Sequence, residues 1–540
     1  MDILSEMDGR ETPEEKRLIS VSDQPERGRG GFSWKIFVNY VGPGWLMSLA
    51  FIDPGNMEAD LQAGAFTSFK FLWVLLLAHL MGLLVQNFAS RLGVVSGKSL
   101  ATVCRDNYHW TLRWFLWFMA ELAIIGADVQ EVVGSSIALH VLFGTPLWLG
   151  CILTGLLTVG FLVVYHMHGV KIIEYFVVLM VCVIFVCFSL NFAATGPDWW
   201  SLIHGLLVPR LPSNVAQTTQ VVAMIGSVIM PHNLFLHSNL IARKNLDRKS
   251  SRSISQAIRY FVYDSIFALM FSFMINLALQ GSFAQGFYSP HCAGNPGSPL
   301  GCDPSVLVPD LSVCLLEDCG CTTPSGFVGI CASIGLANAG SSLASILPHR
   351  ASLLFGLGLL AAGQASTVSG TMAGQYVMEG FLDLKIPFWL RMLVTRSVAL
   401  IPAIAVSLMQ FEFRNMDGLN QFINVLQSIQ LPFALLPLLH FTSTFEVMSR
   451  WTIFGFQRLC GWIVALGLIA MNVLMIRQRY LGIHSHTVQT VCSSIAAVYV
   501  LILVWLIRED IWQFLRFLMG RNSPPATPVQ TDRYSKLATL

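Results

Sequence analysis

Apolar segments about twenty residues long recur from residue 42 to residue 508, and this recurrence constrains the fold more than any other feature. A helix needs about twenty apolar residues to cross the hydrocarbon core of a membrane. Charged residues make up only 12% of the 540 residues, about half the share that is typical of soluble domains. The sequence therefore predicts an all-α polytopic membrane protein, because spans of this length satisfy their backbone groups in lipid as helices.

About twelve transmembrane helices are predicted, and no β-strand is expected. The stretch 326–345 is apolar but rich in Gly, Ala and Ser, so it is either an interfacial helix or a further crossing. The twelve predicted spans are 42–66, 71–95, 112–141, 145–165, 172–194, 217–242, 256–281, 346–366, 388–410, 419–442, 452–476 and 487–508.

Basic residues predict which loops lie in the cytosol. The loop over 281–325 contains neither Lys nor Arg. Because Lys and Arg are enriched in cytoplasmic loops, this loop is expected on the luminal or extracellular side, and the loop after the sixth span in the cytosol. Both termini then lie in the cytosol. The basic residues after the sixth span are Arg243, Lys244, Arg248, Lys249, Arg252 and Arg259.

Four parts of the chain are expected on this basis. They are a cytosolic tail over 1–37, a transmembrane domain over 38–510, an outer loop within it at 282–325, and a cytosolic tail over 511–540. No secretory signal peptide is predicted, because the first 35 residues are charged and polar. A net charge of +2 gives no indication of nucleic-acid binding.

Cysteines gather in the predicted outer loop. An oxidising outer side favours one or two disulfides there, although the pairing cannot be deduced from the sequence. A zinc site is the alternative, but the spacings fit the common zinc patterns poorly. The clustered residues are Cys292, Cys302, Cys314, Cys319 and Cys321.

The first span is interrupted in its middle by the run from Asp53 through Pro54 and Gly55 to Asn56. Pro54 has no amide proton and Gly55 is conformationally free, so the helix is expected to unwind here. Asp53 is then an ionisable group inside a span, which requires a cavity or a cation beside it. The alternative is a water-exposed loop between two short helices.

The sixth span is interrupted in the same way, because Pro231 follows Met230 and precedes His232 and Asn233. Two interrupted helices at corresponding places, the first and sixth, are typical of LeuT-like transporters built from inverted five-helix repeats. In such a fold the half-helices meet near the middle of the membrane and form the substrate site.

The groups at these two breaks favour a cation. They comprise the carboxylate of Asp53, the amide oxygen of Asn56, the thioether of Met230 and main-chain carbonyls near Ser227. Oxygen ligands alone would also suit Mg²⁺ or Ca²⁺, whereas a soft thioether favours transition metals. The alternative role of Met230 is core packing, and its position directly before the second break argues against that.

At these residues the sequence resembles the NRAMP family, the natural resistance-associated macrophage proteins, which are proton-coupled divalent-metal transporters. The resemblance extends from about residue 38 to about residue 510. Four motifs in order carry it, and they are Asp53-Pro-Gly-Asn56, Met230-Pro-His-Asn233, the run from Glu121 through Asp128 to Glu131, and the run from Gly363 to Gly380.

The resemblance implies a ligand set. The first break of the family supplies Asp and Asn, and the second supplies Met and the carbonyl three residues before it. The positions that match are Asp53, Asn56, Met230 and Ser227. Ser227 departs from the usual Ala without altering a main-chain carbonyl. The magnesium-transporting branch of the family lacks the Met, so Met230 favours Mn²⁺ or Fe²⁺, moved toward the cytosol by alternating access.

The resemblance also implies proton co-transport. Asp53 is the expected first acceptor, because protonation and metal ligation compete at one carboxylate. Two histidines beside the second break titrate near neutral pH, and of these His232 is favoured for the proton path over His237. The third span adds a proton or gating network, or alternatively a static ion-pair network. Its members are Glu121, Asp128 and Glu131, which share one helical face, with Arg396 and then Arg391 as the cationic partners.

Two further segments have expected roles. The run from Gly363 to Gly380 contains no nucleotide-binding pattern and is predicted to be a tight cytosolic turn after the eighth span. In the tenth span, Asn424 and Gln427 are candidates to contact the hydrated ion, and Gln430 is expected to form an inter-helix hydrogen bond.

Both tails contain short sequences that indicate a subcellular location. The run from Glu14 to Ile19 resembles an acidic dileucine signal, and the run from Tyr534 to Leu537 resembles a tyrosine-based endocytic signal. They favour an endosomal, lysosomal or vacuolar membrane, with sorting adaptors as partners, over the plasma membrane. No enzymatic motif and no bound cofactor are expected. An amino-acid carrier of the same fold and a membrane metal sensor that does not transport are the competing functions.

Overall fold

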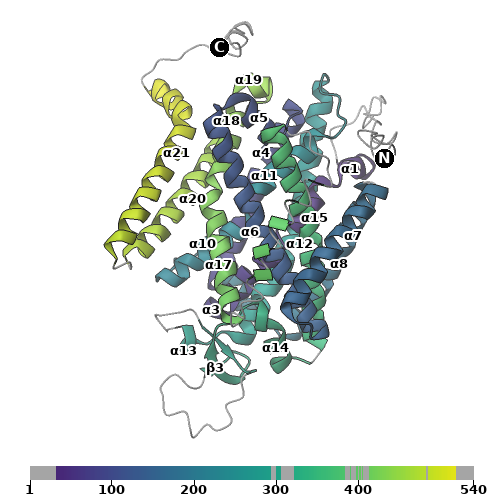
Figure 1. Cartoon of the computed structure of the whole chain (residues 1–540), viewed down its shortest axis with the longest axis vertical. Coiled ribbons are helices and arrows are strands. Elements are labelled where there is room, and N and C mark those ends of the chain that lie inside the picture. Colours follow the sequence, from purple (N-terminus) through teal and green to yellow (C-terminus); the bar gives the residue numbers. More distant parts are fainter. Residues whose placement is uncertain are drawn as a thin grey trace. The chain divides into compact units, whose positions relative to one another are not determined.

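The computed structural model describes residues 32–168, 170–293, 300–305, 321–348, 350–383, 413–481 and 485–518, and residues 390, 394, 397, 398, 401, 402, 404 and 405. Nearly all of these residues are helical (Figure 1). The chain forms two compact units, Met1–Gly482 and Ile483–Leu540. The second contains the helix α21 (His486–Leu518), and all the predicted metal and proton-path residues belong to the first.

Within the described residues, nine segments are long and apolar enough to cross a membrane. Three differences separate this number from the predicted twelve. The segment Pro54–Ser96 covers two of the predicted spans. The helix Leu147–His168 matches the predicted fourth span, but only its part Leu147–Thr158 has continuously described side chains, and that part is too short to be counted. The predicted span 388–410 lies largely outside the described residues. The prediction of a helical polytopic membrane protein is confirmed.

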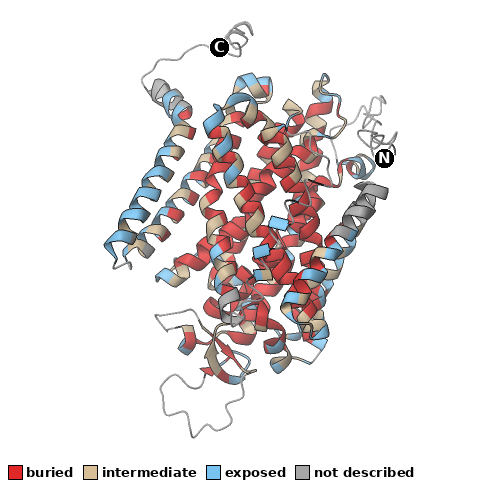
Figure 2. Cartoon of the chain, viewed as in Figure 1, coloured by how far each residue is buried: buried red, intermediate tan, exposed pale blue. Residues whose placement is uncertain are grey.

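The helices of the first unit differ in how far they are buried (Figure 2). The apolar stretch of Val215–Ala242 is wholly buried inside the protein, whereas only 28% of the stretch in Phe456–Gln478 is buried. The sixth span is therefore central. The long helices are α4 (Leu72–Ser96), α6 (Trp110–Phe143), α7 (Leu147–His168), α8 (Val170–Ala194), α12 (Ser251–Phe287), α15 (Arg350–Leu382), α17 (Phe413–Gln430) and α20 (Phe456–Leu481).

Short helices connect the long ones and cover their ends. They are α1 (Trp34–Tyr40), η1 (Ser68–Phe71), α5 (Leu100–Asn107), α9 (Trp199–Leu207), α13 (Pro290–Ala293), α14 (Leu336–Ile346), α18 (Pro432–Ser443), α19 (Phe445–Met448) and η2 (Ser449–Trp451).

Both predicted helix interruptions are confirmed. The first span consists of α2 (Pro43–Leu49) and α3 (Pro54–Thr67), and the sixth of α10 (Val215–Val228) and α11 (Pro231–Ala242). In each span a proline occupies the first position of the second half-helix, where its missing amide proton costs no hydrogen bond. The residues of α3 are all buried, which excludes the alternative of a water-exposed loop between short helices.

The predicted cytosolic turn over 363–380 is wrong, because this run lies inside the continuous helix α15. Its small residues serve packing between helices instead of a turn. A Cβ on Gly363 would collide with Ser135 of α6, so α15 and α6 approach closely only with glycine at this position. The run 363–380 contains no proline that would end the helix. Its small residues allow neighbouring helices to pack closely and do not by themselves break a helix.

A small antiparallel sheet on the outer loop is a second correction, since no strand was expected. It comprises β1 (Gly301–Asp303), β2 (Cys321–Thr322) and β3 (Val328–Ala332), in the order β1-β3-β2. The stretch 326–345 therefore begins as a strand. The helix that follows it, α14, has 11 residues, and about twenty are needed to cross a membrane.

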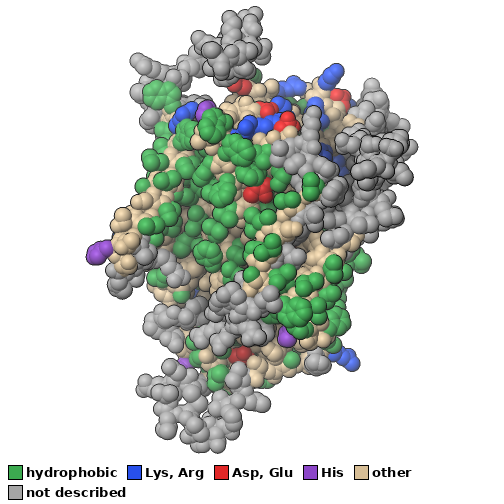
Figure 3. Space-filling view, viewed as in Figure 1, with side chains coloured by type: hydrophobic (Ala, Val, Ile, Leu, Met, Phe, Trp, Pro, Cys, Tyr) green, Lys and Arg blue, Asp and Glu red, His purple; other side chains and the backbone are tan. Residues whose placement is uncertain are grey.

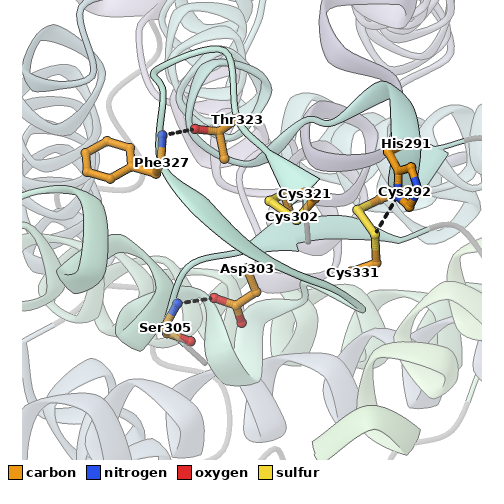
Figure 4. Close-up of a disulfide and its surroundings, with 9 residues drawn as sticks. All are labelled: His291, Cys292, Cys302, Asp303, Ser305, Cys321, Thr323, Phe327 and Cys331. Carbon is orange, nitrogen blue, oxygen red and sulfur yellow. Dashed lines mark hydrogen bonds between the residues drawn. A yellow bond between two sulfur atoms is a disulfide. The ribbon is translucent and has the colours of Figure 1, made fainter. Parts of the chain in front are cut away.

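Two disulfides fasten this sheet and confirm the favoured prediction for the loop. They join Cys292 to Cys331 and Cys302 to Cys321 (Figure 4). Cys331 lies on β3 and was not among the five cysteines predicted to form disulfides. Cys314 and Cys319 lie outside the described residues.

Candidate metal-transport site

Asp53 stands at the start of α3 and caps it. Its Oδ1 accepts a hydrogen bond from the amide of Asn56 at 2.9 Å. Its Oδ2 is buried without a hydrogen-bond partner among the described residues. A buried carboxylate oxygen of this kind is costly unless a cation or a proton occupies it. The first break thus presents one acidic oxygen that the protein itself does not satisfy.

Asn56 lies one turn into α3 and faces the same break. Its Nδ2 donates to the carbonyl of Ala50 at 3.2 Å, and this carbonyl has lost its helical donor because residue 54 is proline. The Oδ1 of Asn56 is buried without a hydrogen-bond partner among the described residues. The amide is therefore oriented with its oxygen available as a ligand.

The second break offers a carbonyl and a thioether. The carbonyl of Ser227 has no helical donor, because the amide that would serve it belongs to Pro231. The Ser227 hydroxyl donates to the carbonyl of Met224 at 3.0 Å. Met230 is extended, with φ −73° and ψ 133°, and precedes α11 as Asp53 precedes α3. Its side chain is 2% exposed.

The two breaks lie beside one another. The half-helices pair crosswise, because α3 packs on α10 and α2 packs on α11. A Cβ on Gly82 of α4 would lie 2.8 Å from the ring of Phe51 and 3.9 Å from a side-chain carbon of Ile229. Since Phe51 belongs to the first break and Ile229 to the second, both breaks contact the same turn of α4.

Two of the three predicted acidic residues of the third span lie together. A Cβ on Gly370 of α15 would be 2.9 Å from Oδ1 of Asp128 and 3.1 Å from Oε1 of Glu131. Glu121 is held separately, since its Oε1 accepts a hydrogen bond from the indole of Trp117 at 3.1 Å. The predicted cationic partners Arg391 and Arg396 lie outside the described residues.

The two histidines after the second break are in different situations. His237 shares a hydrogen bond of 2.7 Å between its Nε2 and the hydroxyl of Ser90 on α4. His232 is 3% exposed, and its Nδ1 has no hydrogen-bond partner among the described residues. The Nδ1 of His237 also has no hydrogen-bond partner among the described residues, so what sets His237 apart is its bond to Ser90 on α4.

The tenth span contributes amides to the site. Asn424 donates to the carbonyl of Gly55 at 2.9 Å, which ties α17 to the first break. The side-chain amides of Gln427 and Gln430 are buried without hydrogen bonds to the described residues. The inter-helix hydrogen bond expected of Gln430 is thus made by Asn424.

Two acidic residues of α3 were missed by the sequence-based prediction. Asp60 is buried, and neither carboxylate oxygen has a hydrogen-bond partner among the described residues. It lies seven residues after Asp53, on the same helical face, and this spacing was a readable signal. Glu58 is buried too, but its Oε2 accepts from the amide of Leu336 at 2.6 Å, which fastens α3 to α14.

Comparisons with known proteins agree with this geometry. Residues 44–478 match the family model described as natural resistance-associated macrophage protein-like. The chain is 40% identical over 476 residues to the metal transporter Nramp6 of Oryza sativa subsp. japonica, covering 85% of this chain and 81% of that relative. It is 37% identical over 529 residues to the metal transporter Nramp3.2 of Populus trichocarpa, covering 95% and 96%.

Solved structures give the same result. The chain superimposes on a mutant manganese transporter of Eremococcus coleocola with a TM-score of 0.71 and 28% identity. The match covers 92% of this chain and 99% of that one. Both breaks, and with them all four predicted ligand residues, lie inside the residues that match the family model.

Proposed function

We propose that this chain, which belongs to the natural resistance-associated macrophage protein (NRAMP) family, carries Mn²⁺ or Fe²⁺ together with protons toward the cytosol by alternating access. One observation carries the proposal. Where the two interrupted helices meet, a carboxylate oxygen of Asp53 and an amide oxygen of Asn56 are buried without hydrogen-bond partners in the described part of the chain. A dehydrated cation supplies what these oxygens lack.

Selectivity among cations follows from the second break. Mg²⁺ and Ca²⁺ prefer oxygen ligands throughout, whereas a thioether is a soft ligand that suits transition metals. Met230 stands directly before α11, three residues after Ser227, whose carbonyl has no helical donor because residue 231 is proline. A site with one soft ligand discriminates against the abundant hard ions, and the substrate class is therefore the transition metals.

Proton coupling follows from competition at Asp53, since one carboxylate binds a metal ion or a proton but not both with full strength. The neighbouring groups that offer a route away from it are His232 on α11 and the carboxyl pair of Asp128 and Glu131 on α6. Gly370 of α15 lies against that pair, since a Cβ there would be 2.9 Å from Oδ1 of Asp128, so a change of charge on the pair acts directly on helix packing.

The proposal also includes the orientation of the protein in the membrane and its subcellular location. Lys and Arg side chains visible in Figure 3 gather at the end of the first unit that carries α5, and basic loops face the cytosol. The sheet with its two disulfides would then face an oxidising lumen. With the sorting-like sequences in both tails, we place the protein in an endosomal, lysosomal or vacuolar membrane with cytosolic termini.

The proposal is tested by Mn²⁺ uptake into proteoliposomes of the full-length protein, with and without an inward proton gradient. We expect uptake that the gradient stimulates and that Asp53→Ala abolishes. Met230→Ala should retain uptake but allow Mg²⁺ and Ca²⁺ to compete. Met270→Ala is the matched control, because Met270 is an exposed methionine of α12, and it should leave selectivity unchanged.

Two results would contradict the proposal. Absence of Mn²⁺ and Fe²⁺ flux from folded protein would remove the carrier function and favour a sensor or an amino-acid carrier. Uptake that ignores the proton gradient, with Asp53→Ala still inactive, would preserve the metal site and remove proton coupling alone.

A further inference from the structure

Three potential metal ligands meet on the outer sheet, away from the transport site. His291 and Cys292 are consecutive residues of α13, and Cys331 lies on β3. The ligand atoms of all three residues lie within 4.8 Å of one another. The imidazole Nδ1 of His291 is 3.8 Å from Sγ of Cys331 (Figure 4). In the described structure the two sulfurs are joined as a disulfide.

The two disulfides of this sheet differ in their accessibility. Cys302 and Cys321 are 0% and 2% exposed, so their bond is closed to an attacking thiol. Cys331 is only partly buried, and the exposed His291 stands beside it. Thiol exchange requires access to one sulfur of the bond. A small thiol can reach the sulfur of Cys331, and attack there releases the thiolate of the buried Cys292, so this disulfide is the one open to reduction.

We propose that His291, Cys292 and Cys331 form a thiol-gated metal site. Two molecules of a small thiol such as glutathione donate two electrons to the disulfide. The Cys292–Cys331 bond breaks, the two cysteines are left as thiols, and the small thiols leave joined as their own disulfide. A soft divalent cation then binds both sulfurs and the imidazole, and the two thiol protons are released to water.

The donor set defines the ligand. Two thiolates and one imidazole are the ligands of tetrahedral Zn²⁺ sites, and three protein ligands leave a fourth position for water. Cys331 is held in place without the Cys292–Cys331 bond, because β1 and β3 pair with Cys302 opposite Cys331, and α13 packs on β1 and α3. The buried Cys302–Cys321 bond also remains to fasten the strands. Hard cations such as Mg²⁺ are not expected to bind.

The test uses full-length protein in detergent that carries Asp53→Ala, so that the transport site does not contribute and the result does not depend on transport. Cys314→Ser and Cys319→Ser are added, because both residues lie outside the described structure and would bring further thiols. Zn²⁺ binding is measured by titration before and after reduction with a phosphine. We expect about one additional Zn²⁺ per chain after reduction. Co²⁺ in place of Zn²⁺ should then show thiolate charge-transfer absorption.

Variants separate this site from other thiols. His291→Ala should weaken the additional binding by at least about tenfold, and Cys331→Ser should abolish it. His486→Ala and Cys460→Ser are the matched controls, since both residues lie elsewhere, and neither should change it. Equal Zn²⁺ binding before and after reduction would overturn the proposal. So would additional binding that persists in the His291→Ala, Cys331→Ser double variant, which also decides the case if Cys331→Ser alone folds poorly.

Discussion

Asn424 of α17 donates a hydrogen bond to the main-chain carbonyl of Gly55 at 2.9 Å, and so connects the tenth predicted span to the first helix break. The Oδ1 of the same amide accepts from Nε2 of Gln130 on α6 at 2.9 Å. A Cβ on Gly55 would lie 2.7 Å from Oε1 of Gln130. One side-chain amide therefore holds the start of α3 against two helices, at a position where an added Cβ would displace the Gln130 amide.

Asn424→Ala is expected to weaken Mn²⁺ transport through this contact. The substitution leaves the buried carbonyl of Gly55 without its donor, at a cost of about 1–3 kcal/mol. Because Gly55 lies between the two proposed ligands of the first break, part of this cost should appear as weaker apparent Mn²⁺ affinity. A loss of about tenfold corresponds to 1.4 kcal/mol, and it is measured as the KM for uptake.

Asn472→Ala is the matched control for that experiment. Asn472 of α20 is also buried and donates to the carbonyl of Ser428, again on α17, at 2.8 Å. It makes no contact with either break that the structure records. Both variants should lower the apparent Tm, but only Asn424→Ala should raise the KM. An equal rise in KM for both would mean that α17 acts through its general packing.

Gly134→Ala is expected to destabilise the protein and stop uptake. The added Cβ would lie 2.7 Å from Cγ of Pro54, a rigid ring at the first break. Overpacking of this kind costs about 1–3 kcal/mol, more than the roughly 1 kcal/mol that alanine gains over glycine in a helix. Gly418→Ala on α17 meets no atom within 4 Å and should be neutral or stabilising. Thermal unfolding in detergent compares the two, and equal Tm values would contradict the clash.

The breaks themselves could be predicted because proline acts locally. Pro54 and Pro231 each remove one amide, and this effect needs no knowledge of neighbouring helices. The main-chain carbonyls that lose their donors were anticipated for the same reason, and Asp53 and Asn56 were named as candidate ligands because they flank the first break. The carboxyl pair of Asp128 and Glu131 was visible from helical spacing on one element.

Features that depend on two elements were harder to predict. The run after Gly363 was taken for a turn, because small residues suit both turns and close helix contacts, and only the presence of α6 decides between them. Cys331 was missed as a disulfide partner because it lies on a strand, and short strands carry no signal in an apolar stretch. Asp60 was missed for a different reason. Its seven-residue spacing from Asp53 is visible in the sequence and would have placed both carboxyl groups on one helical face.

Loss of the Cys302–Cys321 disulfide should loosen the outer sheet without affecting transport. The bond closes a loop with a sequence separation of 19, for which a stabilisation of about 3 kcal/mol is typical. We expect Cys302→Ser, Cys321→Ser protein to be cleaved faster by added protease between β1 and β3. Mn²⁺ uptake by intact protein should stay within about twofold of the parent, since no proposed ligand of the transport site lies on the sheet. Loss of uptake in uncleaved protein would show that the sheet controls the transport site.

Pro231→Ala tests whether the missing amide creates the metal ligand. Alanine would restore an N–H that can donate to the carbonyl of Ser227 and allow α10 and α11 to join as one helix. A carbonyl engaged in a helical hydrogen bond is a poorer ligand, so the KM for Mn²⁺ should rise about tenfold or more. The apparent Tm should not fall, because a more continuous helix loses no packing.

Pro437→Ala supplies the comparison that makes this result interpretable. Pro437 also lies inside a buried helix, α18, but not at either break. Replacing it removes a helix-disfavouring residue that costs about 3 kcal/mol in a regular helix, so a stable protein with unchanged KM is expected. If both variants raised the KM alike, proline would be acting on helix packing in general. If only Pro231→Ala does so, the free carbonyl of Ser227 is part of the metal site.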